Sequence, residues 1–294
     1  SFYNLLDDES WDAFTPKIGF QWQPNDVTQL YGFYTRGFRS GGYNLRNTSP
    51  TASPGPFDQE TQDSFEVGLK TDLFDGRVRM NAAVFYNKLE DLQREVNLPG
   101  NQTGVIQIID NTADATIQGF DFEARAFVTD SLTATVNAGY VDGQYDEVIF
   151  DISGDGVVDE EDEALDIPRL APWSYGASLI YDRDIGNGMA VNALVSFNHR
   201  DQAPYTDNNE GLLKEADMLD ASISLYLMDR ALKLSVYGKN LKDEVTIGGD
   251  TQLPDIFAGG PLAGAVFGIT PGPNATFSPL NKGRIIGFEV EYNY

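Results

Sequence analysis

The chain has 294 residues, of which 41% are hydrophobic and 12% aromatic, with 29 glycines and no cysteine. Its formal net charge of −25 argues against nucleic acid as a partner, because a phosphate backbone needs a basic surface. The sequence has no apolar run of about 18 residues, so it predicts no transmembrane helix, and a role in a membrane would depend on strands.

Alternation of apolar and polar residues with a period of two is the main pattern along the chain, and it predicts β-strands. In the last segment, Ile286, Phe288 and Val290 share one face, while Glu289 and Glu291 lie on the other. In chain order, strands are predicted at 18–22, 31–35, 65–73, 78–86, 120–126, 132–140, 173–182, 190–199, 218–227, 231–240 and 283–294. Eleven strands without a helical period indicate an all-β fold.

The connections between these strands alternate between short and long. Short links rich in turn formers occur at 23–26, 74–76, 128–131, 184–188 and 228–230. Long polar loops are predicted near 38–61, 91–113, 146–170, 201–216 and 242–282. Short turns at one rim and long loops at the other are typical of an antiparallel transmembrane β-barrel of the bacterial outer membrane, with the turns and the C-terminus periplasmic.

The parity of the strand count bears on how complete the barrel is. Single-chain bacterial barrels have even strand numbers, so eleven strands predict either a missed strand or a piece of a larger barrel. The first thirteen residues read as the end of an extracellular loop. We therefore expect a fragment of a longer chain.

Several sequence blocks in a fixed order resemble one known family. They are WDAFTPKIGFQWQPNDVTQLYGFYTRGFRSGGYN, FEVGLKTDLFDGRVRMNAAVFYNKLEDLQ, NTADATIQGFDFEARAFVTDSLTATVNAGYVDGQY, LSVYGKNLKDE and the closing aromatic strand. Together they are similar to the C-terminal part of TonB-dependent outer-membrane receptors. The resemblance implies that residues 1–294 form the second half of a 22-stranded barrel, without the N-terminal plug domain.

The resemblance also implies function and partners. In that family the barrel encloses a plug, and energy delivered through TonB lets a bound small ligand pass. The expected partners are the lipid bilayer, lipopolysaccharide, the plug and the TonB system. The ligand class, whether siderophore–iron, vitamin or oligosaccharide, does not follow from the matching blocks, which are mostly scaffold.

The segment DISGDGVVDEED, residues 151–162, has the spacing of an EF-hand-type calcium loop. Oxygen-bearing side chains stand at positions 1, 3, 5, 9 and 12, and Gly156 stands at position 6, where a sharp turn is needed. Aspartate at position 12 resembles the dockerin-type loop. The predicted ligands of a structural Ca²⁺ are Asp151, Ser153, Asp155, the Val157 carbonyl, Asp159 and Asp162. The alternative is an acidic, solvated loop tip.

Other candidate residues point to ligand binding rather than catalysis. His199 is the only histidine, and no nucleophile-elbow sequence accompanies it, so no enzyme and no catalytic residue is predicted. At strand ends and in loops, polar and aromatic side chains are candidate ligand contacts: Arg36, Arg39, Tyr43, Asn44, Trp11 and Tyr205. The alternative for each of them is a polar or aromatic residue at the rim of the barrel that contacts no ligand.

Charged residues of both signs alternate with the apolar positions of neighbouring strands. Examples are Glu66, Lys70, Asp121 and Glu123, which are predicted to face the lumen and to stabilise the wall by pairing across strands. Aromatic residues near strand ends are predicted to form interfacial girdles: Trp22, Tyr31, Trp173, Tyr181 and Tyr294.

Two functional hypotheses follow, and a third is weaker. The first is an energised receptor that imports a scarce ligand across the outer membrane. The second is a passive porin or structural barrel, closed with twelve strands if one strand lies hidden in 1–13 or 242–282. The third is a secreted β-sandwich that carries a calcium loop.

Overall fold

The computed structural model describes residues 7–45, 54–153, 155–209, 211–247, 251–253, 275–277 and 280–293, apart from 101–103. It contains one large sheet whose strands are β1 (Lys17–Asn25), β2 (Thr28–Arg39), β3 (Glu60–Leu73), β4 (Val78–Gly100), β5 (Gly104–Phe127), β6 (Leu132–Val148), β7 (Trp173–Gly186), β8 (Met189–Arg200), β11 (Ala216–Leu227), β12 (Leu232–Lys239) and β15 (Ile285–Tyr292). The remaining elements are the short helix α1 (Glu160–Glu163) and the small strands β9 (Ala203–Pro204), β10 (Leu212–Leu213), β13 (Thr251–Leu253) and β14 (Ala275–Phe277).

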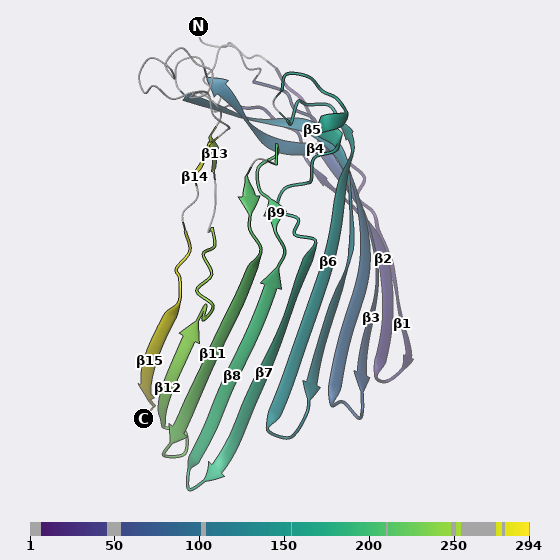
Figure 1. The fold of residues 1–294 in the computed structure, drawn as a ribbon. Coiled ribbons are helices and arrows are strands. Elements are labelled where there is room, and N and C mark those ends of the chain that lie inside the picture. Colours follow the sequence, from purple (N-terminus) through teal and green to yellow (C-terminus); the bar gives the residue numbers. More distant parts are fainter. Residues whose placement is uncertain are drawn as a thin grey trace, which may run out of the picture.

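The large sheet has eleven strands in the order of the sequence, except that β9, β10, β13 and β14 lie outside it. Every neighbouring pair is antiparallel, from β1 against β2 to β12 against β15. Figure 1 shows the sheet curved into an open trough, with short turns at one end and long connections at the other. The predicted all-β antiparallel architecture with eleven strands is confirmed.

The short turns follow from residues that tolerate a left-handed backbone. Asn187 and Gly188 have φ values of 53° and 69° between β7 and β8, as a two-residue hairpin turn with a strong right-handed twist requires. The turn between β11 and β12 places Met228, Asp229 and Arg230 at φ values of 55°, 55° and 71°. Non-glycine residues carry a cost there, and Asp229 is tied down by donating its N–H to the Gly188 carbonyl at 2.9 Å.

The predicted loop at 91–113 is wrong, because β4 and β5 continue as a paired hairpin to Gly100 and Gly104. The register shifts between Leu89 and Leu92, where Asp91 has a φ of 56°, and a β-bulge of this kind bends the ribbon without ending it. Beyond this bulge the strands no longer have a uniformly apolar face, so the alternation that predicts the other strands is weak. Residues 54–59 of the 38–61 loop and the connections near 146–170 and 201–216 lie at the predicted end, whereas most of 248–282 is outside the described residues.

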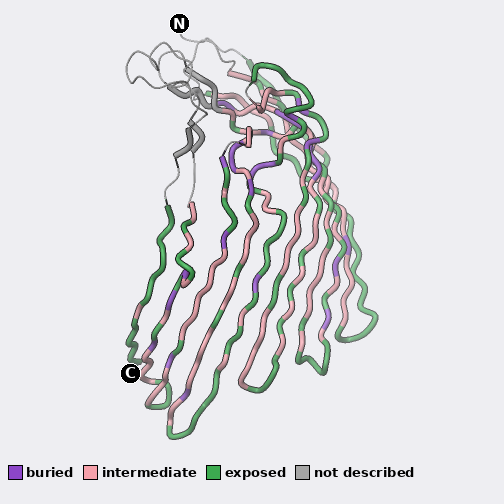
Figure 2. Tube along the Cα trace, in the orientation of Figure 1, coloured by how far each residue is buried: buried purple, intermediate pink, exposed green. Residues whose placement is uncertain are grey.

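A small apolar core lies at the loop end of the sheet. It is formed by strand extensions and by the connection between β6 and β7, which carries α1. Figure 2 shows that buried residues gather at this end. Its buried members are Leu89, Ala113, Ala115, Tyr145, Val148 and Ile167, with Leu92, Ile117, Ile152, Leu165 and Leu170 packed against them. The connection from β6 to β7 is therefore folded onto the sheet rather than extended into solvent.

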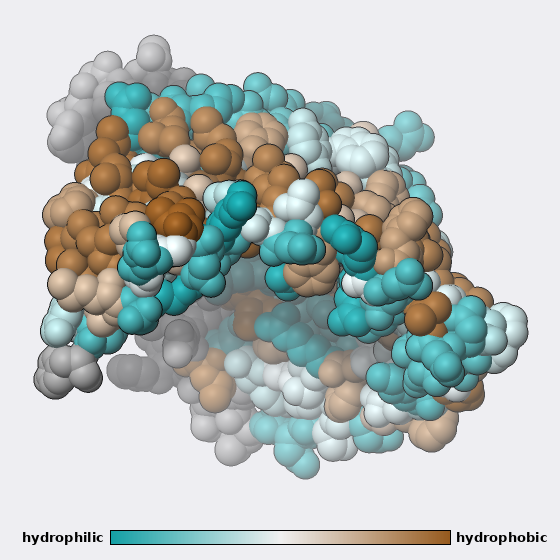
Figure 3. Space-filling model, turned by 90° about the horizontal axis from the view of Figure 1, so that it is seen from below, coloured by the Kyte–Doolittle hydropathy of each residue, from teal (hydrophilic) through white to brown (hydrophobic). Residues whose placement is uncertain are grey.

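The two faces of the sheet differ in polarity. Large apolar side chains that share one strand parity are exposed, among them Ile18 at 70%, Val67 at 54% and Phe288 at 67%. Figure 3, seen from the turn end, shows hydrophobic residues on the convex outside and hydrophilic residues around the hollow. Among the described residues, no helix has the length and apolarity needed to cross a bilayer.

Candidate functional site at the loop end of the concave face

The concave wall carries a polar recess of 430 Å³, lined by residues of β2 to β7 that include Tyr31, Glu66, Lys70, Asp121 and Glu123. The Tyr31 hydroxyl donates to Glu66 at 2.7 Å, and the Lys70 ammonium lies 5.6 Å from the centroid of the Tyr31 ring. The wall is thus lined with charges of both signs in fixed positions, as the sequence predicts for the lumen-facing parity.

The β6–β7 connection lies against the concave side of the strands at the loop end. A Cβ on Gly143 would lie 2.5 Å from Leu170 and 3.2 Å from Ile167, so this connection approaches the backbone of β6 closely. Gly143 pairs with Ile117, and Tyr145 pairs with Ala115, which are concave-facing positions of β5. The connection therefore narrows the loop end of the trough.

A second connection, between β8 and β11, binds to the first. The Asp166 N–H donates to Asn209 Oδ1 at 2.8 Å, and Asn209 Nδ2 donates back to the Asp166 carbonyl at 2.9 Å. The Arg169 N–H donates to the Pro204 carbonyl at 2.7 Å. The same connection forms an ion pair from Asp207 to Arg94 on β4. The loops thus form one connected layer above the concave wall.

The predicted ligand contacts Trp11 and Tyr43 are brought together in this region. Their rings meet edge to face with centroids 6.2 Å apart. Gly41 permits the contact, because a Cβ there would lie 2.5 Å from the Trp11 ring and 2.2 Å from the Phe57 carbonyl oxygen. Burial raises the pKa of the Tyr43 hydroxyl, which lies enclosed in the β2–β3 connection.

Asn44 and Tyr205, two further predicted contacts, have structural partners. Asn44 Nδ2 donates to the Ile109 carbonyl and its Oδ1 accepts from the Ile109 N–H, each at 2.8 Å. This pair of bonds fastens the β2–β3 connection to β5. Tyr205 is only 6% exposed within the β8–β11 connection. Both residues shape the loop layer, and their role in ligand contact stays a prediction.

Arg36 and Arg39 lie on opposite faces of β2. Arg36 pairs with Asp63 in the ladder and shares the parity of Tyr34, so it lies on the convex face, where it contacts Asp63 and Glu90. Arg39 pairs with Glu60 and has the concave parity, at the exposed end of the strand. A ligand that enters the trough would therefore meet Arg39 and not Arg36.

The predicted calcium ligands lie together in the β6–β7 connection, where their oxygens organise the loop itself. Asp162 is fully buried, and its carboxylate accepts the N–H groups of Ile152 at 2.8 Å, Ser153 at 2.7 Å and Asp159 at 3.0 Å. Asp151 Oδ2 accepts the N–H of Gly156, which has a φ of 98°. Burial alone would raise the pKa of Asp162, but the three N–H donors outweigh it and the pKa is lowered.

The described part of the chain has no group of three or more His, Cys, Asp or Glu side chains that converges as a metal site. The oxygens of residues 151–162 are of the type that Ca²⁺ prefers. Asp162 Oδ1 already accepts two N–H donors and Oδ2 accepts one, so only Oδ2 keeps a lone pair for an ion. The donor types suit the ion, and calcium binding stays a prediction.

His199 lies at the loop end of β8 on the convex parity. Its ring stacks on Tyr175 with centroids 4.5 Å apart, and its two nitrogens face Asp217 at 2.6 Å and Asp201 at 2.9 Å. Asp217 also pairs with Lys242. This cluster joins β7, β8 and β11 and resembles a structural clasp.

Sequence reasoning did not identify several residues that build the loop layer. Gln93 is 5% exposed and donates from Nε2 to the carbonyls of Asp58 at 2.8 Å and Ser40 at 3.0 Å. Tyr145 is 6% exposed, and burial raises the pKa of its hydroxyl, which has no hydrogen-bond partner among the described residues. Both residues lie beside shifts of strand register, which sequence periodicity alone does not show.

Comparison with known proteins places this architecture. A family described as TonB dependent receptor-like, beta-barrel, matches residues 2–241. The chain is 27% identical over 145 residues to the metal-pseudopaline receptor CntO of Pseudomonas aeruginosa strain UCBPP-PA14. The aligned segment covers 49% of this chain and 18% of that receptor.

Two solved structures show the same fold. The ferric yersiniabactin uptake receptor FyuA from Yersinia pestis superposes with a TM-score of 0.71 at 18% identity, over 95% of this chain and 37% of that one. The ferric preacinetobactin receptor BauA from Acinetobacter baumannii gives a TM-score of 0.62 at 12% identity, over 94% of this chain and 36% of that one. The chain thus spans well under half the length of these relatives.

Proposed function

Because this chain belongs to the TonB-dependent receptor family, as part of its outer-membrane β-barrel, we propose that it forms the C-terminal half of the barrel of a receptor that imports a metal–chelator complex. The coarse conclusion, transport of a nutrient by an outer-membrane receptor rather than an enzymatic reaction, follows from the family. The ligand class rests on the names of the relatives, which are receptors for metal-pseudopaline, ferric yersiniabactin and ferric preacinetobactin.

The observation that carries the proposal is the loop layer above the concave wall. Trp11 and Tyr43 offer aromatic edges, and Arg39 offers an exposed guanidinium at the end of β2. Aromatic surface and a forked cation suit a chelator with carboxylate or phenolate groups around a metal ion. The metal in this proposal is cargo within its chelator.

The remaining partners belong to the same proposal. The 22-stranded barrel is completed by strands outside this chain, and its plug domain lies against the concave wall near Tyr31, Glu66 and Lys70. TonB acts on the plug, and the convex face contacts the bilayer and lipopolysaccharide. The turn end and the C-terminus are periplasmic, so the loop end faces the outside of the cell.

The test uses the full-length receptor in cells that lack other routes of uptake for an iron-labelled chelator. Substituting Arg39→Ala is expected to weaken ligand binding by about tenfold, the loss of one charge-assisted contact. Arg36→Ala is the matched control, because the same change on the convex face leaves ligand binding unaltered. Accumulation should stop when the proton-motive force is collapsed.

Two results would contradict the proposal. Uptake that continues without the proton-motive force would favour the passive porin instead. If the Arg39→Ala and wild-type receptors, both present in the outer membrane, bind the ligand with equal affinity, the loop layer does not recognise the ligand through Arg39.

A further inference from the structure

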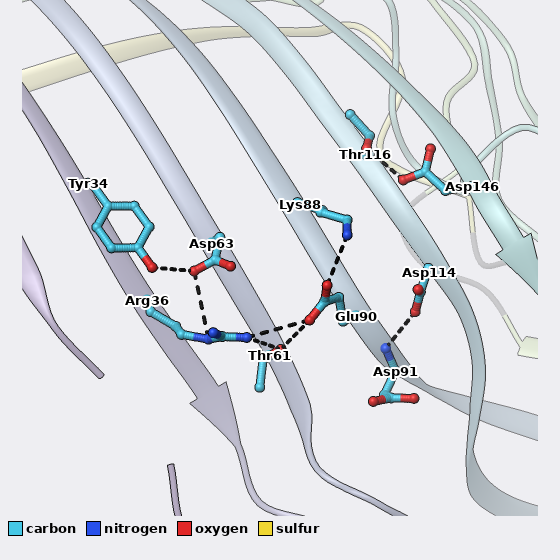
Figure 4. A network of polar contacts seen from close by, with 10 residues as sticks. All are labelled: Tyr34, Arg36, Thr61, Asp63, Lys88, Glu90, Asp91, Asp114, Thr116 and Asp146. Atoms are coloured by element: carbon cyan, nitrogen blue, oxygen red, sulfur yellow. Dashed lines mark hydrogen bonds and ion pairs between the residues drawn. The ribbon is translucent and has the colours of Figure 1, made fainter. Parts of the chain in front are cut away.

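The β4–β5 hairpin bends over the loop end of the trough (Figure 1), and polar contacts fix the bend. The Asp91 N–H donates to Asp114 Oδ1 on β5 at 2.9 Å, as Figure 4 shows. Just past the bulge, the Gln93 N–H donates to Glu60 Oε2 on β3 at 2.8 Å. Arg94, the next residue of β4, therefore extends from a backbone whose position is fixed.

The guanidinium of Arg94 is bound to a carboxylate from a distant part of the chain. Arg94 pairs with Asp110 of β5 in the ladder, yet it forms an ion pair with Asp207 on the β8–β11 connection. The side chains of Arg94 and Asp207 remain 24% and 34% exposed. An ion pair between partly exposed side chains is weak, because water and dissolved ions compete for both charges. A carboxylate from outside can therefore replace Asp207 on Arg94.

A hydroxyl without a partner lies near this ion pair. Tyr145 on β6 is 6% exposed, and its hydroxyl makes no hydrogen bond among the described residues. Burial raises the pKa of this hydroxyl, and the charge of the nearby Arg94 guanidinium opposes that effect. A buried hydroxyl that lacks a partner costs free energy, which an acceptor placed beside it would recover.

The segments that cover Tyr145 are joined to the segment that carries Asp207. Ile167 of the β6–β7 connection packs in the same core as Tyr145. Its neighbour Asp166 exchanges two hydrogen bonds with Asn209, at 2.8 Å and 2.9 Å. Asp207 and Asn209 belong to the same connection, so release of Asp207 from its cation loosens the cover over Tyr145.

We propose that Arg94 and Tyr145 form a carboxylate subsite in which Asp207 occupies the position of a carboxylate of the imported ligand. When the ligand carboxylate replaces Asp207, the β8–β11 connection is released from the β4–β5 hairpin. The guanidinium supplies charge and paired N–H donors, and the hydroxyl supplies one more donor. This inference rests on the proposed function and adds that an acidic residue of the receptor itself competes with the ligand.

The experiment measures binding of citrate, as a carboxylate probe, to the purified full-length receptor by calorimetry at low salt. Asp207→Asn is expected to bind citrate about tenfold more tightly than wild type, because the internal competitor is removed. Glu215→Gln is the matched control, since it removes the same charge from an exposed position of the same connection and should bind citrate like wild type. Triethyl citrate, which has no ionised carboxylate, should show no gain with Asp207→Asn.

Two double variants assign the gain to the subsite. Asp207→Asn/Arg94→Gln should lose the gain completely. Asp207→Asn/Tyr145→Phe keeps the aromatic ring but lacks the hydroxyl, and it should bind citrate about threefold to tenfold more weakly than Asp207→Asn alone. Heat-modifiable migration in gels shows that each variant is folded.

Hydrogen exchange tests the release of the connection without any substitution. The protection factors of residues 203–209 should fall when citrate is added to wild type and should already be low in Asp207→Asn. Equal citrate affinity of Asp207→Asn and wild type, an equal gain in Glu215→Gln, or a gain that survives Arg94→Gln would each overturn the subsite. Protection factors of wild type that citrate does not change would overturn the release.

The two proposals fail separately. Uptake that continues without the proton-motive force would overturn the proposed function, whatever citrate does. Energised uptake by a receptor in which Asp207→Asn leaves citrate binding unchanged would overturn the subsite alone.

Discussion

Nδ1 of His199 on β8 lies 2.6 Å from Oδ1 of Asp217 on β11, while Nε2 of the same ring faces Asp201. Both ring nitrogens face carboxylate oxygens, an arrangement that favours the doubly protonated imidazolium. The relationship fastens two strands at the point where their ladder ends, because Ala216 and Arg200 are the last pair of β11 and β8.

The first prediction concerns this clasp. His199→Phe keeps the aromatic ring on Tyr175 but removes both hydrogen bonds. A double-mutant cycle with Asp217→Asn is expected to give a coupling energy of about 1 kcal/mol, because the histidine is largely buried and the aspartate partly so. Unfolding in detergent measures it, and strictly additive effects of the two substitutions would argue against the clasp.

A second prediction concerns the packing of the concave wall. A Cβ on Gly68 would lie 2.3 Å from Cζ of Tyr31, whereas a Cβ on Gly37 meets no atom within 4 Å. Gly68→Ala must therefore displace the Tyr31 ring and break its hydrogen bond to Glu66, which lowers the free energy of unfolding by about 1–3 kcal/mol. Gly37→Ala, on the same face of the neighbouring strand, is the control and should change it by no more than about 0.5 kcal/mol. Equal melting temperatures of the two variants would refute this account.

The third prediction is a pH dependence of the β6–β7 connection. The folded pKa of Asp162 is lowered, so its contribution to stability is fully present above the unfolded pKa of about 3.9 and is lost as the pH falls through the folded pKa. The protection factors of residues 151–165 against hydrogen exchange should be constant from about pH 7 to 5 and fall in acid below about pH 4. Asp162→Asn should raise exchange at neutral pH and remove this acid step. An unchanged acid step in that variant would assign it to another group.

The fourth prediction is calcium binding by residues 151–162. Titration of the receptor with Tb³⁺ or Ca²⁺ is expected to show one site, with a dissociation constant of about 10⁻⁴ to 10⁻³ M for calcium, as in extracellular modules. Asp151→Asn/Asp155→Asn should abolish it. Glu161→Gln, which removes a charge from an exposed neighbour that is not a predicted ligand, should leave it unchanged. Saturable binding that survives the Asp151→Asn/Asp155→Asn change would place the ion elsewhere.

The eleven strands were predictable from sequence because most residues at every second position between the turns, on the convex face, are apolar. The same rule fails at the loop end. Past Asp91 the register of the β4–β5 hairpin shifts and the alternation of apolar and polar residues is weak, so these strands were predicted as a loop. Arg36 lies two residues beyond Tyr34 and therefore on the same face of β2. Sequence periodicity predicted that this strand ends at Thr35, so the face on which Arg36 lies was not predicted.

The loop layer was less predictable than the wall. Arg94 and Asp207 are 113 positions apart, and neither carries a local pattern that points to the other. Trp11 and Tyr43 were identified as aromatic loop residues, yet their contact depends on Gly41, whose missing side chain leaves the space. Long-range pairings of this kind follow from the order of the strands, which sequence periodicity does not give.

The polar residue at every second position of the strands also bears on how such a chain is exported. A segment is retained in the inner membrane when about 20 consecutive residues are apolar. In β15, Ile286, Phe288 and Val290 alternate with Gly287, Glu289 and Glu291, so the unfolded strand is far from that composition. The continuous hydrophobic surface of the sheet forms only when neighbouring strands pair and their apolar residues come together. Affinity for lipid is therefore a property of the assembled sheet, and the unfolded chain does not have it while it crosses the first membrane.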